Sequence, residues 1–274
     1  MDKKRSAFFV SDRTGITAEM LGHSLLTQFE AIEFEHVTIP FLDSLEKAEE
    51  TARRIDAIAA QDGTRPIVFS TLVNPKISAI VESAQALFVD CFHVFIAPLE
   101  AELGIRSSHV IGRAHTAGNV AEYHQRIEAV NYALAHDDGI SVRDLESAQV
   151  ILTGVSRSGK TPTCLYLALQ FGIRCANYPL VPEDLSEGKL PRHLLANREK
   201  LYGLTINPER LQKIRAERRP KSDYASLANC QQEVRAAETL MRDAKVPFLD
   251  TTTKSIEELA STIVQLAKLT RHVY

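Results

Sequence analysis

Short apolar segments alternate with longer amphipathic segments along most of the chain. The short segments are rich in Val, Ile, Leu and Phe and have the length of buried strands, whereas the longer ones repeat their apolar residues at helical spacing. Strands are predicted at residues 6–12, 36–42, 65–72, 92–99, 148–154, 174–181, 201–207 and 246–253. Helices are predicted at residues 18–29, 44–61, 121–136, 161–172 and 255–270. This alternation predicts an α/β protein with mostly parallel sheet.

One stretch between the two halves differs from its surroundings. Residues 102–119 are richer in Gly, Ser, Arg and His than their neighbours, which is typical of a loop or crossover. We therefore predict an N-terminal α/β domain over residues 1–105, a connecting helical and loop segment over 106–145, and a second α/β domain over 146–274. No internal repeat is apparent along the sequence.

Composition narrows the class of protein. The chain has 274 residues, of which 45% are hydrophobic and 24% charged, as is typical of a soluble globular protein. The formal net charge of −3 gives no general attraction to nucleic acid or to an anionic membrane, so neither is an expected partner. No apolar run approaches the ~18 residues that span a bilayer. The 4 cysteines form no C-x-x-C pair, which fits a protein of the reducing cytoplasm.

Residues 154–161, GVSRSGKT, have the form of a phosphate-binding loop, with a predicted strand before it and a predicted helix after it. Glycines let the backbone bring its N–H groups to phosphate oxygens, and the helix dipole is directed at the same anion. Lys160 would neutralise phosphate charge, which also makes it a candidate catalytic residue, and the Thr161 hydroxyl would ligate Mg²⁺. The candidate nucleotide-binding residues are Gly154, Val155, Ser156, Arg157, Ser158, Gly159, Lys160 and Thr161. The alternative is a glycine turn beside an incidental lysine.

A second magnesium ligand is harder to find. GTPases and motor ATPases usually carry an aspartate at the end of another apolar strand, but the candidate strands end in Asn207 and Asp250, and neither is convincing. The closing segment, residues 248–266, resembles instead the last strand and helix of small-molecule and nucleoside monophosphate kinases. The second domain is therefore predicted to be a P-loop kinase-like domain.

The sequence His136-Asp137-Asp138-Gly139 lies just before the strand of the loop. Asp137 and Asp138 are candidate catalytic residues, because a carboxylate there could act as a general base or hold Mg²⁺. The alternative is a turn that ends a helix, since Asp-Gly is common in turns and histidine is favoured near a helix C-terminus.

Three other polar segments have both a functional and a structural interpretation. Residues 11–17, SDRTGIT, could hold an anion at the end of a strand or simply cap a helix. Arg106, His109, Arg113 and His115 could recognise phosphate or be solvated loop residues. The basic group Arg215, Arg218, Arg219 and Lys221 could form a lid over phosphates or a solvated helix face.

Several segments in the same order resemble one known family. They are VSDRTGITAEMLGHSLLTQF, RIEAVNYALAHDDG, GVSRSGKTPTCLYLALQFGIRCANYPLV and PFLDTTTKSIEELA, and TIPFLD and YASLANCQQEV favour one branch of it. The chain resembles the bacterial pyruvate, phosphate/water dikinase regulatory proteins, in the branch that regulates phosphoenolpyruvate synthase. The resemblance extends over nearly the whole chain.

The resemblance implies a bifunctional serine/threonine kinase and phosphorylase whose protein partner is phosphoenolpyruvate synthase. Such proteins phosphorylate a threonine of the synthase with ADP as donor, and remove the phosphoryl group with inorganic phosphate, releasing pyrophosphate. Residues 154–161 would then bind ADP with Mg²⁺, Arg157 and the 215–221 cluster would be candidates for binding inorganic phosphate, and Asp138 or Asp137 would be the base. The residues alone are equally compatible with an ATP-dependent small-molecule kinase or a nucleotide-sensing module, and they leave homo-oligomer formation open.

Overall fold

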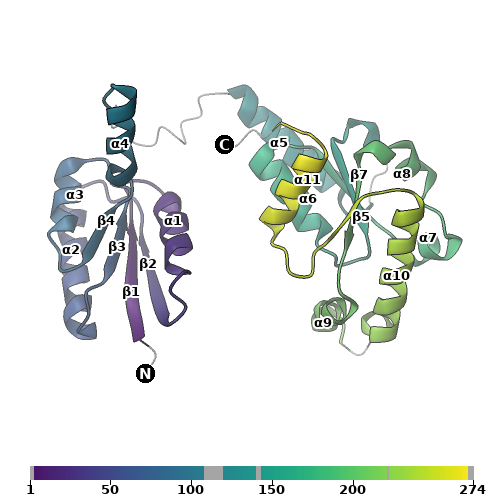
Figure 1. Cartoon of the computed structure of the whole chain (residues 1–274), viewed down its shortest axis with the longest axis horizontal. Coiled ribbons are helices and arrows are strands. Elements are labelled where there is room, and N and C mark those ends of the chain that lie inside the picture. Colours follow the sequence, from purple (N-terminus) through teal and green to yellow (C-terminus); the bar gives the residue numbers. More distant parts are fainter. Residues whose placement is uncertain (1–2, 108–119, 140–142, 221, 271–274) are drawn as a thin grey trace. The chain divides into compact units, whose positions relative to one another are not determined.

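The computed structural model describes residues 3–107, 120–139, 143–220 and 222–270 (Figure 1). The chain forms two compact units, Met1–Thr116 and Ala117–Tyr274. The helix predicted at 121–136, within the expected connecting segment, belongs to the second unit. Among the described residues no helix is long and apolar enough to cross a membrane.

The N-terminal unit is a parallel sheet with helices on both faces (Figure 1). Its strands lie in the order β2-β1-β3-β4, and β1 pairs with β2 over its whole length. The elements are β1 (Lys3–Val10), α1 (Ile16–Leu26), β2 (Ile32–Ile39), α2 (Leu45–Asp62), β3 (Ile67–Ser70), α3 (Pro75–Glu82), β4 (Leu87–Asp90) and α4 (His93–Leu103).

The prediction of a strand at residues 92–99 is wrong. These residues form the N-cap and the first two turns of α4, and the strand is β4, which ends just before them. Asp90 explains where the strand gives way to a helix, since its Oδ1 accepts hydrogen bonds from the backbone N–H groups of Phe92 (2.9 Å) and His93 (2.8 Å). A carboxylate in this position satisfies the free N–H groups of a first helical turn. The unbroken apolar run from 92 to 99 fits a strand or a helix equally well, so periodicity could not decide between them.

The C-terminal unit is also a parallel sheet covered on both faces, with the strand order β6-β5-β7-β8 (Figure 1). The predicted α/β class is therefore confirmed for both units. The longer elements of this unit are α5 (Val120–Ala135), β5 (Val150–Gly154), α6 (Lys160–Phe171), β6 (Cys175–Pro179), β7 (Leu201–Thr205), α9 (Pro208–Arg218), α10 (Leu227–Asp243), β8 (Phe248–Asp250) and α11 (Ile256–Leu266). The shorter ones are η2 (Asp137–Gly139), η3 (Leu145–Ser147), α7 (Pro182–Glu187), α8 (Arg192–Ala196), η4 (Arg198–Lys200) and η5 (Asp223–Ala225).

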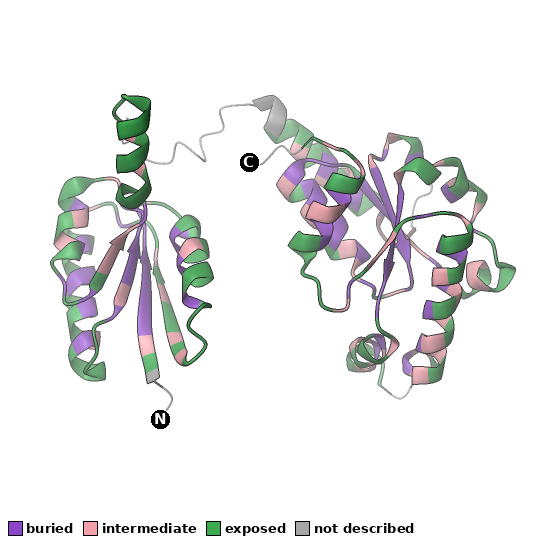
Figure 2. Ribbon diagram, viewed as in Figure 1, coloured by how far each residue is buried: buried purple, intermediate pink, exposed green. Residues whose placement is uncertain are grey.

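Each sheet of the protein separates two apolar cores, as expected for parallel strands buried on both faces. In the C-terminal unit, Leu152 packs on one face with residues of α6 and α11, and its neighbour Ile151 packs on the other face with α9 and α10. In the N-terminal unit, Phe8 packs toward α2 and α3, whereas Phe9 packs toward α1. Figure 2 shows the central strands β1, β3, β5 and β7 buried over most of their length, between helices with exposed outer faces, whereas the edge strands β2, β4 and β8 are partly exposed.

The two units share one strand order, although no repeat is apparent in the sequence. In each, the first strand lies between the second and the third, so the chain winds in opposite directions on either side of it. Ligands of open α/β sheets bind at the carboxyl ends of the strands where this reversal occurs. The loop after β5 lies at that point in the C-terminal unit, and the loop after β1 occupies the same point in the N-terminal unit.

Candidate active site

The predicted phosphate-binding loop connects β5 to α6. Its backbone enters the left-handed region at Gly154 (φ 140°), Arg157 (φ 75°) and Gly159 (φ 91°), of which Gly159 is the N-cap of α6. This cap has no side chain that bonds to the first helical turn, so the N–H groups and the positive end of the helix dipole face the loop. The arrangement is the strand, glycine turn and helix that bind phosphate in this class of loop.

Gly154 is required by close packing as well as by its backbone conformation. A Cβ atom at this position would lie 2.1 Å from the carbonyl oxygen of Leu204 on the neighbouring β7, a backbone atom that cannot move aside easily. Val155, the next residue, is 1% exposed and anchors the loop in the core. The start of the loop is therefore fixed against the sheet.

Lys160 is buried, with 3% of its surface exposed, and its Nζ donates a hydrogen bond to the carbonyl oxygen of Val155 at 2.8 Å. Burial lowers its pKa to about 8, because the charged ammonium loses its hydration, and this effect is opposed by the nearby carboxylates of Asp138 and Asp137. The lysine side chain thus folds back over its own loop, with its ammonium close to both candidate carboxylates.

Thr161, the candidate metal ligand, lies next to Asp137. Its Oγ1 donates to Asp137 Oδ1 at 2.8 Å, and the Nδ2 of Asn177 on β6 lies within hydrogen-bonding distance of both Asp137 Oδ1 and Thr161 Oγ1. Asn177 is 2% exposed, and its Oδ1 has no hydrogen-bond partner among the described residues. The fold therefore brings together a hydroxyl, a carboxylate and an amide from three separate segments.

His136 is fixed by backbone contacts. Its ring nitrogens lie 2.9 Å from the carbonyl oxygen of Tyr132 and 2.8 Å from that of Arg143, and its ring stacks on the ring of Tyr132 at 3.9 Å. Both nitrogens are thereby occupied, and the backbone carbonyl of His136 accepts from the N–H of Asn177 at 2.9 Å. The histidine positions the residues that follow it.

Asp138 differs from Asp137 in exposure and conformation. It is exposed and has a left-handed backbone (φ 49°), which is uncommon for a residue other than glycine. Its Oδ1 lies 3.4 Å from the Nδ2 of Asn177. Asp138 is therefore the more exposed carboxylate of this pair, and Asp137 is partly buried.

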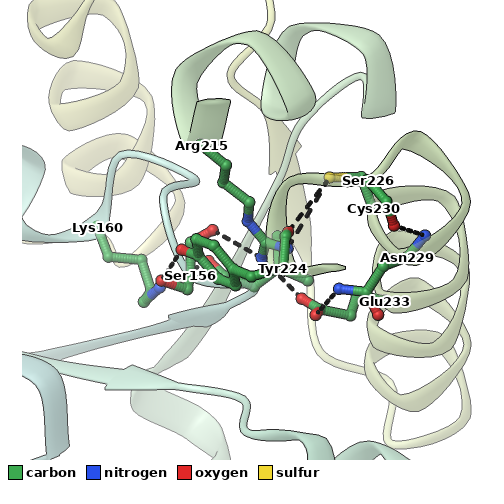
Figure 3. Close-up of polar contacts among 9 residues, drawn as sticks. Ser156, Lys160, Arg215, Tyr224, Ser226, Asn229, Cys230 and Glu233 are labelled. Atoms are coloured by element: carbon green, nitrogen blue, oxygen red, sulfur yellow. Dashed lines mark hydrogen bonds and ion pairs between the residues drawn. The ribbon is translucent and has the colours of Figure 1, made fainter. Parts of the chain in front are cut away.

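Arg215 has a different role from the one predicted. The hypothesis that it binds phosphate at the surface is wrong, because its side chain is 0% exposed and its Nη2 donates to Glu233 Oε2 at 2.7 Å (Figure 3). The same nitrogen donates to the carbonyl oxygen of Ser156 at 3.1 Å, and Nη1 donates to that of Tyr224 at 3.1 Å. The buried guanidinium thus stabilises the candidate phosphate-binding loop through its backbone, at the Ser156 carbonyl.

Ser156 is fixed by its side chain as well as by its backbone carbonyl. Its Oγ lies 2.9 Å from the hydroxyl of Tyr224, whose ring lies under the Arg215 guanidinium, 4.1 Å from ring centre to Cζ (Figure 3). The adjacent Ser158 is 1% exposed, and its Oγ has no partner among the described residues. Arg157 between them is exposed, so within this part of the loop it is the side chain that can reach a ligand from the solvent side.

The remaining basic residues lie elsewhere. Arg218 and Arg219 are exposed at the end of α9, and Lys221 lies outside the described residues. Arg106 belongs to the N-terminal unit, and the predicted candidates His109, Arg113 and His115 also lie outside the part of the chain that the structure describes.

The predicted anion-binding segment of the N-terminal unit, residues 11–17, lines a cavity of about 1450 Å³ at the carboxyl ends of the strands. Arg106 lines the same cavity, together with apolar residues of α3 and α4. Gly15 is the N-cap of α1 in a left-handed conformation (φ 81°), as Gly159 is for α6. Capping by Thr14 or Thr17 is not what the structure has, since α1 shows no side-chain cap.

The side chains at the two strand ends considered for a second magnesium ligand, Asn207 and Asp250, both accept hydrogen bonds from nearby backbone N–H groups. Asn207 accepts from the N–H of Arg210 at 3.0 Å and caps α9, and Asp250 accepts from the N–H of Thr252 at 2.8 Å. The carboxylate beside Thr161 comes instead from Asp137, upstream of β5.

Sequence reasoning missed Asn177, Tyr224 and Glu233. Asn177 could have been suspected, because it is a polar residue in the middle of the apolar strand segment 174–181, and a buried amide requires partners. Tyr224 and Glu233 carry no such signal, since their contacts with the loop depend on how α9, η5 and α10 fold back on it.

Comparison with known proteins shows the family to which the chain belongs. The family model described as kinase/pyrophosphorylase matches residues 7–264, which include every residue of the site. The chain belongs to the kinase/pyrophosphorylase family, and this membership supports a phosphotransferase-type activity.

Curated relatives of the chain share one name, "Putative phosphoenolpyruvate synthase regulatory protein". The relative from Aromatoleum aromaticum is 58% identical over 271 residues, covering 98% of both chains. The relative from Alkalilimnicola ehrlichii is 55% identical over 273 residues, covering 100% of this chain and 99% of its own. The relative from Hahella chejuensis is 50% identical over 270 residues, covering 98% and 99%.

Proposed function

We propose that this protein regulates phosphoenolpyruvate synthase by reversible phosphorylation, with ADP as the phosphoryl donor. The observation that carries the proposal is the phosphate-binding loop at residues 154–161, with Lys160, Asp137 and Asp138 gathered beside it. The kinase/pyrophosphorylase family and the names of the relatives support the reaction class and the target.

Binding of the nucleotide would use the loop and the helix that follows it. The N–H groups from Gly154 to Thr161 and the positive end of α6 favour an anion at this point, and a diphosphate fills such a loop with its two phosphates. Lys160 would exchange its hydrogen bond to the Val155 carbonyl for contacts with phosphate oxygens. A bound Mg²⁺ would neutralise phosphate charge, and Thr161 is the loop residue that would ligate it.

Inactivation of the synthase would transfer the β-phosphoryl group of ADP to a threonine hydroxyl. A bond forms between the threonine oxygen and the β-phosphorus while the bond from that phosphorus to the bridging oxygen breaks, and AMP leaves. Asp138 is the proposed base for the threonine proton, because it is the exposed carboxylate of the pair. Most of the rate enhancement would come from positioning and from charge neutralisation by Lys160.

Reactivation would use inorganic phosphate as the acceptor. An oxygen of hydrogen phosphate forms a bond to the phosphorus of phosphothreonine while the bond from that phosphorus to the threonine oxygen breaks. The proton of the attacking hydrogen phosphate passes to the threonine oxygen, so the hydroxyl is restored and pyrophosphate leaves. Arg157 is the proposed residue for binding the attacking phosphate, because it is exposed within the loop. Arg215 is not proposed for this step, since its guanidinium is buried against Glu233.

The variant Lys160→Ala tests the proposal. We expect it to lose ADP binding and both reactions with phosphoenolpyruvate synthase, while its unfolding midpoint stays near that of the wild type. Lys213→Ala, which removes an exposed lysine from α9, is the matched control and should keep both reactions. Survival of either reaction in Lys160→Ala would show that this loop is not the shared site.

A further inference from the structure

The pair of aspartates before β5 has two distinct surroundings, and these suggest two roles. Asp137 is partly buried and bonded to the loop residue Thr161, whereas Asp138 is exposed. We propose that Asp137, Thr161 and Asn177 together form a divalent-cation site beside the nucleotide, which leaves Asp138 free to take the proton. This inference rests on the proposed function, because the nucleotide phosphates supply the other ligands of the cation.

The donor atoms fit a hard cation. A carboxylate, a hydroxyl and an amide oxygen are all oxygen ligands, and Mg²⁺ prefers one or two carboxylates combined with phosphate oxygens and water. Among the described residues there is no group of three or more His, Cys, Asp or Glu side chains that could hold a metal ion. The proposed site would have one carboxylate, from Asp137, completed by the Thr161 hydroxyl, the Asn177 amide and the substrate.

The amide of Asn177 supplies independent evidence for a ligand. Asn177 is 2% exposed, yet within the part of the chain that the structure describes its Oδ1 has no hydrogen-bond partner, and an unsatisfied buried acceptor is destabilising. Its Nδ2 meanwhile lies against oxygens of Asp137 and Thr161, and 3.4 Å from one of Asp138. The position of this nitrogen, close to several oxygen atoms, would therefore also suit a cation.

The two ends of the amide have nearly the same size, so a rotation of the Asn177 side chain exchanges oxygen for nitrogen with little change in packing. With a cation between the three side chains, Oδ1 would turn toward it as a ligand. Without one, Nδ2 is the better neighbour for the Asp137 carboxylate. Asn177 is thus suited to both states of the site.

The fold holds these three groups in place from different directions. Thr161 lies in the first turn of α6, and Asn177 lies on β6, which pairs directly with β5. Asp137 follows His136, whose ring and backbone are fixed by hydrogen bonds to Tyr132, Arg143 and Asn177. The cation ligand that P-loop proteins usually take from a later strand is here supplied from upstream of the loop.

The test separates binding of the cation from binding of the nucleotide. Affinity for ADP is measured by calorimetry in EDTA and again with Mn²⁺, and bound Mn²⁺ is counted by electron paramagnetic resonance. In the wild type we expect Mn²⁺ to tighten ADP binding about tenfold or more. Asp137→Asn and Asn177→Ala should lose most of this gain, since removing ligands or their supports typically costs about 10–100-fold in metal affinity.

Two comparisons show whether loss of the Mn²⁺-dependent gain is specific to the proposed ligands: Asp138→Asn with Asp137→Asn, and Thr161→Ser with Thr161→Val. Asp138→Asn should retain the Mn²⁺-dependent gain, which distinguishes its role from that of Asp137. Thr161→Ser keeps the hydroxyl and should retain the gain, whereas Thr161→Val should lose it. Tyrosine fluorescence during unfolding identifies any variant that fails to fold, in which case the remaining variants decide.

The outcomes separate this inference from the proposed function. If ADP binds in EDTA but Asp137→Asn and Asn177→Ala keep the full Mn²⁺-dependent gain, the cation site is overturned and the proposed function stands. The same conclusion follows if the gain is lost in Asp138→Asn and kept in Asp137→Asn. If the wild type does not bind ADP under either condition, the proposed function fails and this inference fails with it.

Discussion

The buried guanidinium of Arg215 donates a hydrogen bond to the backbone carbonyl of Ser156, in the third position of the phosphate-binding loop, at 3.1 Å. The same nitrogen is paired with Glu233 on α10, and Tyr224 completes the contact (Figure 3). The conformation of the loop therefore depends on α9 and α10, which lie further along the chain and begin at Pro208 and Leu227.

Replacing Glu233 by Gln should destabilise the C-terminal unit by about 3 kcal/mol. Removing one partner of a buried ion pair leaves the other charge uncompensated and costs roughly 3–5 kcal/mol, and the amide oxygen of Gln keeps the loss near the low end. Affinity for ADP should also fall, because Arg215 would hold Ser156 less firmly. All 7 tyrosines lie at or beyond residue 123 and the chain has no tryptophan, so tyrosine fluorescence in urea follows this unit alone.

Glu217→Gln is the control for that measurement. Glu217 is exposed on α9, and exposed substitutions away from specific contacts usually change stability by less than about 0.5 kcal/mol. Equal stability of Glu233→Gln and Glu217→Gln would mean that the Arg215 pair does not support the loop.

Replacing Gly154 by Ala should abolish nucleotide binding and destabilise the fold. The added Cβ would lie 2.1 Å from the Leu204 carbonyl oxygen, so β5 or β7 must shift, and the loop must shift with them. Gly188→Ala is the matched control, since Gly188 also has a positive φ (66°) but no atom within 4 Å of its added Cβ. It should cost only the conformational strain, about 1–2 kcal/mol, and keep ADP binding. Normal ADP affinity in Gly154→Ala would contradict the packing argument.

Binding of ADP in EDTA should weaken as the pH rises above about 8. Burial lowers the pKa of Lys160 to about 8, so below this pH the ammonium is present to meet phosphate, and above it ADP binding must take up a proton. Affinity should then fall by up to about tenfold per pH unit, as proton linkage requires. Calorimetry in two buffers of different ionisation enthalpy measures the proton uptake directly.

Lys160→Arg provides the comparison for the pH dependence, because arginine keeps its charge throughout this range. If the arginine variant binds ADP, its affinity should change little between pH 7 and 9.5. A wild-type affinity that is constant from pH 7 to 9.5 would show that the charge of Lys160 does not contribute to binding.

The fold class and the loop could be predicted from sequence because both depend on local patterns. Apolar segments at regular spacing define strands and helices, and GVSRSGKT predicts the glycine turn that the structure has between β5 and α6. Binding of phosphate by this turn stays a prediction. The prediction failed at residues 92–99, because an unbroken apolar run fits a strand or a helix. The helix is favoured by Asp90, whose side chain accepts hydrogen bonds from the backbone N–H groups at its start. The apolar pattern also did not reveal that the two units share a strand order, since many different apolar sequences can form the same sheet.

The rest of the site depends on contacts between distant segments. Asp137 could be suspected from sequence, but its bond to Thr161 depends on how the turn after α5 packs against α6. Arg215 was misassigned because its charge is visible in the sequence, whereas its burial depends on Glu233, Tyr224 and the loop together. Charge clusters therefore predict function only after burial is known.

The central claim is that the loop at 154–161 transfers the β-phosphoryl group of ADP to phosphoenolpyruvate synthase. Purified protein and synthase are incubated with ADP carrying a ³²P label in the β-phosphate, and the synthase is then examined for labelled threonine. The account predicts labelled phosphothreonine with the wild type and none with Lys160→Ala, followed by release of the label as pyrophosphate when inorganic phosphate is added. Label that reaches the synthase only from the γ-phosphate of ATP, or that never reaches it while ADP is bound, would contradict the account.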